Sequence, residues 1–541
     1  MVVFHALRRV PMKSAGVAGF ALSGLFGLLF VLILTPHGFL AGTSSYWQTQ
    51  VEDIGQYQSG FTAYVNSPWM IPLLAIPSLN WPTGTVVTFV DAIPALALPW
   101  KVLASLFPMP ENPFGFWLLL CFVLQGIGAW YVARHLRPDN WWALGFIVVL
   151  CVWMPSLAAR MGHLSLQAHF ILLFAFGLYF RTRNEGRTLV WPWTALIVGA
   201  FYVNFYLTAM AIAMMVACSL DLYFKTGRKL GLYLHAIPIV IVIFTIPVFL
   251  GTAFSKAVPD TGFGFYSMNL LSPIGYGNIV VLPFYKPGPG QYEGYNYLGL
   301  GLIIACLSAL TLRSTRESGN FNLIGRCLIY VMALFFVYSL SNQVYMSDIN
   351  IIRWSFPKFM SPLFEAFRSS GRFFWPVSYF IIFAVALKLS SLKLKSFIAF
   401  CCVVLSVQAA DLYPTFIYVK KTLVRDANRP ANLNIWNAAL NGINTIHAFP
   451  KFKCNGALMR EIMPLQVIAA SGGYNLTTGF ISRYGADCDA VASEIASSDP
   501  SKSAYVFTRA QFTDEQIKSY IPSGAECRQL DIWVLCRRGM K

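Results

Sequence analysis

An acidic pair, Glu52-Asp53, stands in the polar stretch VEDIGQYQSGFTAYVNSPW, directly after the first apolar run that is long enough to cross a membrane. A carboxylate fixed just outside a bilayer can take a proton from a hydroxyl near the lipid headgroups, whereas a transporter usually keeps its charges deeper. A third carboxylate, Asp91, lies within TVVTFVDAIPALAL, where an unpaired charge is costly. The alternative is that such acids cap helices, as an Asp beside a membrane often does.

Two further segments carry basic residues that could hold a phosphate. In RMGHLSLQAH, a helix would place Arg160, His163 and Gln167 on one face. In FRSSGRFFWP, Arg368 and Arg372 flank Ser-Ser-Gly where an apolar run begins. Guanidinium groups pair bidentately with phosphate oxygens, which favours an anion site. Anchoring at the lipid interface is the alternative, and the spacing of the two histidines is poor for a metal.

A third group of residues suits the recognition of a sugar. The stretches GFGFYSMNLLSPIGYGN and GQYEGYNYLGLG contain Tyr266, Asn269, Glu293 and Tyr297. Aromatic rings stack on sugar C–H faces, while amides and carboxylates bind hydroxyls. The same residues could equally form a packed lid with no ligand.

Composition limits the class of protein that can position these residues. The chain is 56% hydrophobic and 12% charged, against about 45–50% and about 25% in soluble domains, which indicates an integral membrane protein. The run over 14–34 is longer than the apolar part of a signal peptide and lacks a clear cleavage site, so we expect a retained helix. The net charge of +17 does not predict nucleic acid binding, because seventeen of the forty Lys and Arg fall in membrane-anchoring positions.

Basic clusters predict the topology. The positive-inside rule places five clusters between apolar runs, and the N-terminus, in the cytoplasm. Because all five clusters lie on one side, the chain must cross the membrane an even number of times between them. This requirement makes 84–107 a juxtamembrane or re-entrant element and divides 189–224 into two spans with a tip at 204–206. The basic residues of these clusters are Arg134 and Arg137; Arg181, Arg183 and Arg187; Lys225, Arg228 and Lys229; Arg313, Arg316 and Arg326; and Lys388, Lys393 and Lys395.

The resulting model is a polytopic α-helical membrane protein with about 11 transmembrane helices. The spans predicted are 14–36, 114–133, 141–158, 165–180, 189–203, 205–224, 231–251, 298–312, 327–341, 373–388 and 396–413. The outer face then receives the first outer loop (37–113), the turn at 159–164, the loops 252–297 and 342–372, and the tail 414–541. The short cytoplasmic loops have no Gly-x-x-x-x-Gly-Lys-Ser/Thr pattern, so a soluble nucleotide donor is not expected.

The tail is long enough for one small extracytoplasmic α/β domain. Helix-like NIWNAALNGI, DAVASEIA and DEQIKSYI alternate with strand-like QVIAA, AYVFT and DIWVL. Four cysteines in an exported domain favour disulfides over a metal site. Three connectivities are possible, and the closeness of Cys527 to Cys536 favours that pair together with Cys454 and Cys488.

The order of these motifs resembles a known group of enzymes. SPWMIPL, FVDAIPALAL, RMGHLSLQAH, FYSMNLLSPI, QYEGYNYLGLG and FRSSGRFFWP are similar to a largely uncharacterised bacterial membrane family that is GT-C-like. The GT-C superfamily consists of glycosyltransferases that depend on polyprenyl-phosphate sugars. The resemblance covers nearly the whole chain. Together with the predicted topology it gives a transmembrane GT-C-like catalytic domain (1–413) and a periplasmic α/β domain (414–541).

The resemblance implies an inverting transfer of a sugar from a polyprenyl-phosphate donor to a surface glycan or lipid, such as O-antigen, at the periplasmic face of a bacterial inner membrane. By position Asp53 is the base and Asp91 a second carboxylate for acceptor or metal; without a doubled Asp-Asp, Glu52 stays open as the base. Chemistry alone assigns Arg160, His163, Arg368 and Arg372 to the donor phosphate. A divalent metal is possible and no other cofactor is expected.

Two other classes of function are compatible with this pattern. A transporter or flippase of lipid-linked glycans would need charges along a path through the spans, where Asp221 and Asp411 stand near span ends. A non-catalytic glycan-assembly subunit would act through its tail, with Asp53 dispensable.

Overall fold

The computed structural model describes residues 12–136, 140–253, 258, 262–312, 321–456 and 458–539. Arg137, Arg313 and Arg316 of the predicted basic clusters lie outside these residues. Contacts divide the chain into two units, each described by itself. The helical unit comprises Met1–Pro36, Phe116–Val242 and Thr261–Leu423, and the mixed unit comprises His37–Gly115, Ile243–Asp260 and Val424–Lys541.

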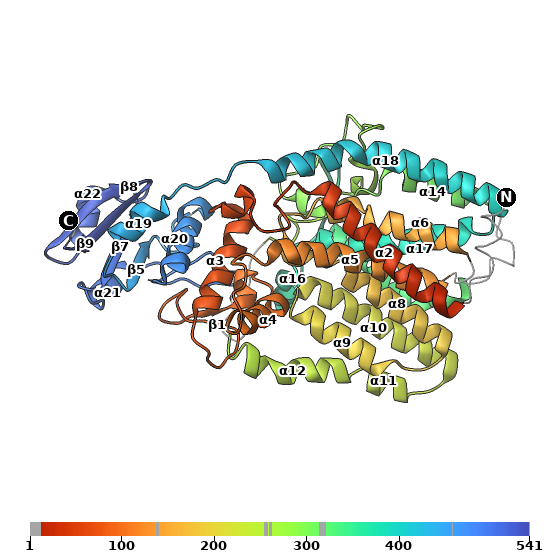
Figure 1. The fold of residues 1–541 in the computed structure, drawn as a ribbon, viewed down its shortest axis with the longest axis horizontal. Coiled ribbons are helices and arrows are strands. Elements are labelled where there is room, and N and C mark those ends of the chain that lie inside the picture. The colour runs from red at the N-terminus through yellow and green to blue at the C-terminus, as the bar shows by residue number, and fades with distance from the viewer. Residues whose placement is uncertain are drawn as a thin grey trace. The chain divides into compact units, whose positions relative to one another are not determined.

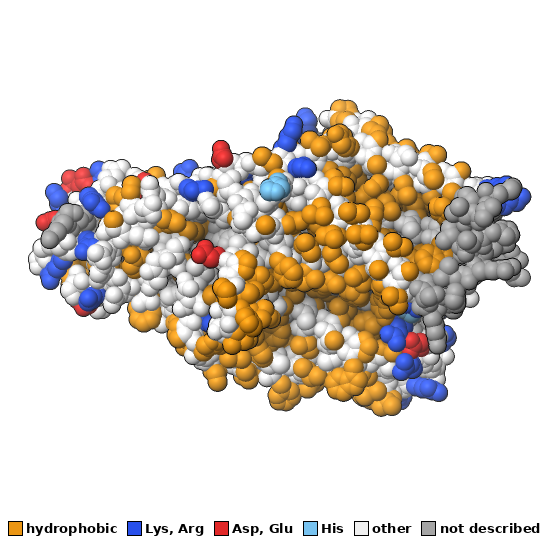
Figure 2. Space-filling view, in the orientation of Figure 1, with side chains coloured by type: hydrophobic (Ala, Val, Ile, Leu, Met, Phe, Trp, Pro, Cys, Tyr) orange, Lys and Arg blue, Asp and Glu red, His pale blue; other side chains and the backbone are white. Residues whose placement is uncertain are grey.

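Apolar helices build the helical unit (Figure 1). Hydrophobic side chains are abundant on the face of this unit that Figure 2 shows, as expected for helices that face lipid. The longer helices are α2 (Met12–Leu34), α5 (Phe114–Leu136), α6 (Trp141–Val152), α8 (Phe170–Glu185), α9 (Val190–Phe201), α10 (Phe205–Thr226), α14 (Leu300–Thr311), α15 (Arg326–Leu340), α17 (Phe374–Leu389) and α18 (Leu394–Val424). Helix α12 (Ile237–Phe249) begins in this unit, and its residues from Ile243 on belong to the mixed unit. Shorter elements are α7 (Pro155–Ala158), α11 (Leu230–Leu234), α13 (Ser272–Gly275), α16 (Ser361–Ala366) and the hairpin of β3 (Gln343–Met346) and β4 (Ile349–Arg353).

The predicted class, a polytopic α-helical membrane protein, is confirmed. Within the described residues, 8 helices are long and apolar enough to cross a membrane. Shorter apolar helices, α9, α14 and α15, stand where three of the remaining spans were predicted, so the count of eleven is not confirmed. The 31-residue helix α18 continues past residue 413 and would be about 46 Å long, more than the apolar thickness of a bilayer.

Glycines let two of these helices approach closely. A Cβ at Gly27 of α2 would lie 2.0 Å from the carbonyl oxygen of Phe122, and one at Gly126 of α5 would lie 2.0 Å from that of Ser23. Backbone-to-backbone packing of this kind replaces the missing hydrophobic driving force inside a membrane.

Part of the first outer loop folds into the mixed unit as η1 (Ser45–Gln48), α3 (Glu52–Asn66), β1 (Ala75–Ile76), β2 (Thr85–Val86), η2 (Val87–Val90) and α4 (Pro94–Ala104). The segment 84–107 thus forms short elements, and α4, which begins with Pro94 at a position that tolerates a missing N–H, has too few residues to cross a membrane. Helix α3 packs against α20 (Met459–Gly472) of the tail, where a Cβ on Gly55 would clash with Met463.

The tail contains the expected small α/β domain. Its five-stranded sheet has the order β6-β5-β7-β9-β8, with β5 (Thr445–Phe449) parallel to β6 (Asn475–Leu476) and β7 (Ser503–Thr508), and β9 (Trp533–Arg538) antiparallel to β7 and β8 (Ala525–Leu530). Helices α19 (Leu433–Ala439), α21 (Val491–Ala496) and α22 (Asp514–Tyr520) lie where helices were predicted.

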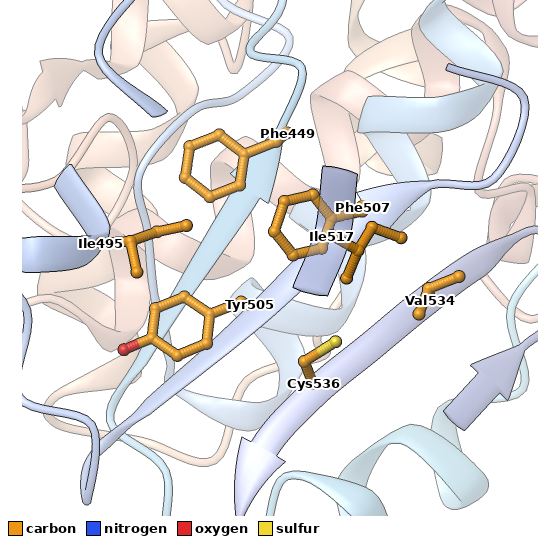
Figure 3. Close-up of a cluster of buried hydrophobic side chains, with 7 residues drawn as sticks. All are labelled: Phe449, Ile495, Tyr505, Phe507, Ile517, Val534 and Cys536. Atoms are coloured by element: carbon orange, nitrogen blue, oxygen red, sulfur yellow. The ribbon is translucent and has the colours of Figure 1, made fainter. Parts of the chain in front are cut away.

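One face of this sheet carries the hydrophobic cluster of Figure 3, made of Phe449, Ile495, Tyr505, Phe507, Ile517, Val534 and Cys536. Disulfides join Cys454 to Cys488 and Cys527 to Cys536, the two pairs that the spacing favoured. Cys527 and Cys536 are directly opposite each other on β8 and β9.

One tail prediction is wrong. The apolar run QVIAA (466–470) is not a strand but the second half of α20, with Ile468, Ala469 and Ala470 buried. A short apolar run that is buried on most sides has no periodicity to distinguish a strand from a helix.

Candidate functional site

The buried carboxylate of Glu293 holds a cluster of basic residues in the helical unit. Its Oε2 lies 2.9 Å from Nη1 of Arg160 and 3.0 Å from both Nε and Nη2 of Arg372. Its Oε1 lies 3.5 Å from Nε2 of His163. Arg160 also donates to the backbone oxygen of Glu293 at 2.6 Å. We call these four residues the Glu293 cluster.

Three loops bring the cluster together at one end of the helices. Arg160 follows α7, His163 precedes the 3₁₀ turn η3 (Leu164–Gln167), and Glu293 lies in η4 (Gln291–Gly294). Arg372 lies in η7 (Ser370–Phe373), directly before α17. Helices α8 and α17 both begin beside these residues and run away from them to Arg183 and Lys388 of the predicted cytoplasmic clusters.

The positive charges of its neighbours set the pKa of the Glu293 carboxylate. Burial alone would raise the pKa of Glu293, but the charges of Arg160 and Arg372, with a smaller contribution from His163, outweigh it and hold this pKa well below the usual range. Burial lowers the pKa of Arg160, and the carboxylate of Glu293 opposes that shift. Two guanidinium groups on one carboxylate leave one positive charge in excess.

Exposure divides the cluster into a buried and a reachable part. The side chains of Arg160 and Glu293 are 4% and 6% exposed, whereas those of Arg372 and His163 are 13% and 29% exposed. Arg160 and Glu293 therefore form the buried foundation, and Arg372 and His163 are the groups that a ligand can reach.

Aromatic residues hold the arginines from the side. The guanidinium of Arg372 lies 4.7 Å from the ring centre of Tyr206, whose hydroxyl accepts a hydrogen bond from the N–H of Ser369 at 3.0 Å. The guanidinium of Arg368 lies 5.3 Å from the ring centre of Tyr266. Such cation–π contacts orient a guanidinium without neutralising it. Tyr206 was not among the predicted site residues, although the hairpin tip that carries it was expected at 204–206.

The segment after α7 differs from the prediction in one respect. Arg160, His163 and Gln167 do not share a helix face, because residues 159–163 form no helix and only η3 follows. The side-chain amide of Gln167 donates to the backbone oxygen of Leu157 at 3.0 Å, away from Glu293.

The predicted sugar-binding residues separate in the structure. Tyr266 joins Arg368, and Glu293 is the counter-ion of the arginines. The amide of Asn269 is buried and donates to Gln291 and to the backbone of Ser347, so it holds the loop together.

Tyr297 has a structural partner in a different place. Its buried hydroxyl donates to Oδ2 of Asp411 at 2.6 Å, and the same oxygen accepts from the N–H of Leu300 at the start of α14. Asp221 is used similarly, accepting from the hydroxyl of Tyr179 and from the first N–H groups of α15. Both buried acids of the spans thus cap helices, which is a structural use of charge.

The acidic pair of the first outer loop lies in the first turn of α3, in the mixed unit. Glu52 forms an ion pair with Arg425, and the guanidinium of Arg425 lies 5.5 Å from the ring centre of Tyr46. Burial raises the pKa of Tyr46 to about 12, with Arg425 opposing the shift and the nearby carboxylates of Glu52 and Asp53 adding to it. Glu52 has φ +73°, a left-handed conformation that is uncommon for a residue other than glycine.

Asp91 lies at a second left-handed position of the same unit, at φ +54°, and Ile93 follows at φ +52°. Positive φ is a genuine outlier for a β-branched residue such as Ile93, and such outliers concentrate at functional sites. The preceding Val90 packs on Gly60 of α3, seven residues and about 10 Å along the helix from Asp53.

A divalent metal finds no ready set of ligands. Over the described ranges, no three His, Cys, Asp or Glu side chains come together in a way that could hold an ion. The residues present do not fit a metal centre, and we derive no chemical step through one.

These features define a multi-pass membrane protein with a basic cluster at one end of its helices and a small α/β domain in its tail. Residues 24–413 match a family described as a domain of unknown function, DUF6311, and residues 435–538 match the DUF6311 C-terminal domain. The chain therefore belongs to the DUF6311 family.

Solved structures provide a further comparison. The chain is similar to the Archaeoglobus fulgidus oligosaccharyltransferase, solved as a crystal structure tethered with an acceptor peptide, with a TM-score of 0.45 and 11% sequence identity. The match covers 86% of this chain and 64% of that one. No curated protein matches the sequence.

Proposed function

We propose that this protein is a membrane glycosyltransferase that moves a sugar from a polyprenyl-phosphate donor to a glycan or lipid acceptor at the periplasmic face of a bacterial inner membrane. The observation that carries the proposal is the Glu293 cluster. It presents an excess positive charge on preorganised guanidinium groups, with an imidazole beside them, at the ends of apolar helices.

A lipid phosphate fits the chemistry of this cluster. Arg372 and His163 are the reachable donors, and Arg368 lies on Tyr266, whose ring contacts that of Tyr292 next to Glu293. Glu293 and Arg160 act as positioning residues, since they fix Arg372 and His163 without facing the ligand. Preorganised donors of this kind stabilise charge that develops on a leaving group.

The acidic pair supplies the base. We assign the role of base to Asp53 by its position in the first outer loop, and its neighbour Glu52, which forms an ion pair with Arg425, helps to fix the start of α3. Asp91 is proposed as the carboxylate that orients the acceptor.

The proposed reaction transfers one proton, forms one bond to the anomeric carbon and breaks another. As the acceptor oxygen attacks the anomeric carbon, its proton passes to Asp53, and the bond from that carbon to the phosphate oxygen breaks. The electron pair of the broken bond leaves with the polyprenyl phosphate, whose negative charge Arg372, His163 and Arg368 stabilise. Attack opposite to the leaving group inverts the anomeric configuration.

A transfer assay tests the proposal. Membranes from cells that lack this protein are supplied with wild-type or variant protein and with polyprenyl-phosphate-linked radiolabelled hexoses and pentoses. Wild type should move one of these sugars into the envelope glycan or lipid fraction, and Asp53→Asn should lose this transfer by at least about 100-fold, the contribution typical of a general base.

The transfer assay has a control variant, and one outcome would contradict the proposal. Arg353→Ala, a change of an exposed arginine on β4, should transfer normally. The proposal fails if no donor in the panel is used while the cells lacking the protein accumulate complete lipid-linked glycan, which is the phenotype of a missing flippase.

A further inference from the structure

The mixed unit contains a large cavity whose lining includes none of the residues proposed above for the chemistry. Its volume is about 960 Å³, at the upper end of what a drug-sized ligand occupies. It is bounded by residues before and on α3, by residues 110–112, by the segment 429–434 and by one side of α20. Parts of the chain more than 300 residues apart in sequence thus form one wall.

The lining is polar but nearly uncharged. Eleven of the 22 lining residues carry an amide or a hydroxyl, and three carry a charge. One of these charges, Asp531, already accepts a hydrogen bond from the indole of Trp436 at 2.9 Å. Such a surface offers many neutral donors and acceptors and little attraction for an ion.

Fixed contacts hold the walls in place. The side-chain amide of Gln50 both donates to and accepts from the backbone of Ala431, at 2.8 and 2.9 Å. Gln466 of α20 donates to the hydroxyl of Ser59 at 2.9 Å. The indole N–H of Trp47 donates to the backbone oxygen of Phe39 at 2.8 Å, which fixes that ring as a rigid part of the lining.

Three lining residues have buried polar atoms that find no hydrogen-bond partner in the described part of the chain. These are the hydroxyl of Thr49 and the amide nitrogens of Gln58 and Asn112. A buried polar group without a partner costs about 1–3 kcal/mol, so natural proteins rarely leave several together unless something else binds them.

We infer that this cavity binds an uncharged, hydroxyl-rich oligosaccharide. Sugar hydroxyls both donate and accept, so they satisfy hydroxyl and amide atoms alike, and a neutral glycan needs no counter-charge. If the proposed glycosyltransferase function holds, this oligosaccharide is the acceptor. Only the identification of the oligosaccharide as the acceptor rests on the proposed function. Its binding can be measured without transfer.

The experiment is a binding measurement on the full-length protein in detergent. Neutral oligosaccharides of two to six sugars, released by mild acid from the envelope polysaccharide of the cells that make the protein, are the probe, and saturation-transfer-difference NMR is the readout. Wild type should bind at least one of them. Thr49→Val combined with Gln58→Leu should weaken that binding at least about ten-fold, the loss expected for about 1.4 kcal/mol of hydrogen bonding.

Two controls separate this inference from the proposed function. Gln529→Leu removes an exposed amide that does not line the cavity and should bind as wild type. Asp53→Asn should lose transfer and keep binding. Binding without any transfer by the wild type would overturn the function and leave the inference standing.

Several results would overturn the inference. They are the absence of binding by any neutral oligosaccharide, equal binding by wild type and the double variant, and competition by a peptide or an anionic sugar in place of a neutral one. A circular dichroism spectrum and a monodisperse size-exclusion profile for the double variant ensure that lost binding does not reflect lost folding.

Discussion

Replacement of Glu293 by Gln should destabilise the protein strongly, because it leaves two guanidinium groups facing each other in a buried place. The side chains of Arg160 and Glu293 are 4% and 6% exposed and their atoms meet at 2.9 Å. At an effective dielectric constant of 20, two unit charges at that separation attract by about 6 kcal/mol, and the cost of removing both from water offsets part of this. Removal of one partner of a buried pair typically costs about 3–5 kcal/mol.

A double-mutant cycle measures the coupling. Glu293→Gln and Arg160→Met are made singly and together, and the free energy of unfolding is measured by steric trapping in bicelles. We expect Glu293→Gln to lose about 3–5 kcal/mol and Arg160→Met, which leaves Glu293 paired with Arg372, to lose less. The double variant should lose at least about 2 kcal/mol less than the sum of the two. Near-additive losses would refute the assignment of Glu293 as the residue that holds Arg160.

A matched pair in the same unit provides the control. Arg181 and Glu185 are four residues apart on α8, contact at 2.6 Å and are about one third exposed. The same cycle there should give a coupling of about 0.3–0.5 kcal/mol, as solvent-exposed helix pairs do. Equal coupling at the two sites would mean that burial does not strengthen the Glu293 pair.

The pH dependence of the coupling follows from the sign of the pKa shift. The pKa of Glu293 is lower in the folded protein than the value near 4.3 of an unfolded Glu. The stabilisation is therefore complete above about pH 5 and is lost only as the pH falls towards the folded pKa. In a His163→Gln background, which removes the imidazole beside Glu293, the coupling should be equal at pH 5.5 and pH 8.

Three further predictions concern ligands and the tail. Arg372→Ala should weaken binding of the lipid-linked donor by about 10–100-fold, the loss of one charge-assisted hydrogen bond, and leave oligosaccharide binding unchanged; unchanged donor affinity would contradict its phosphate role. Glu52→Gln should retain transfer within about ten-fold of wild type while Asp53→Asn does not, and the reverse order in the transfer assay would exchange their roles. Replacement of both cysteines of the Cys454 disulfide by serine, which opens a loop with a sequence separation of 34, should lower the unfolding free energy of the full-length protein by about 4 kcal/mol. The same replacement at the Cys527 disulfide, with a separation of 9, should lower it by about 3 kcal/mol. The reverse order in denaturant unfolding would contradict the loop-entropy argument.

Local patterns were enough to predict much of this protein. Membrane-length apolar runs have an unambiguous composition, because a helix in lipid must be apolar along about 20 residues, so the class of protein followed directly. The break between two helices close to the predicted tip at 204–206, and the short elements within 84–107, also agree with the structure, since charge placement and Pro residues act locally. The α/β character of the tail followed in the same way, except for QVIAA.

The roles of polar residues required the tertiary structure. Glu293 and Tyr297 stand four residues apart in one aromatic stretch and looked alike in the sequence, yet one carboxylate gathers two arginines and one hydroxyl holds Asp411. The sequence suggested a shared helix face for Arg160 and Gln167, but a backbone turn directs them to different partners.

The amino-acid sequence by itself determined which segments prefer lipid, which ends of the helices are basic and where carboxylates and guanidinium groups occur, because these depend on composition and short-range pattern. Only the tertiary structure decided which of those charges neutralise each other and that α3 of the first outer loop folds against α20 of the tail. The physical reason is that a buried ion pair or a cavity wall joins residues hundreds of positions apart, and its energy depends on distance and burial, which no local pattern records.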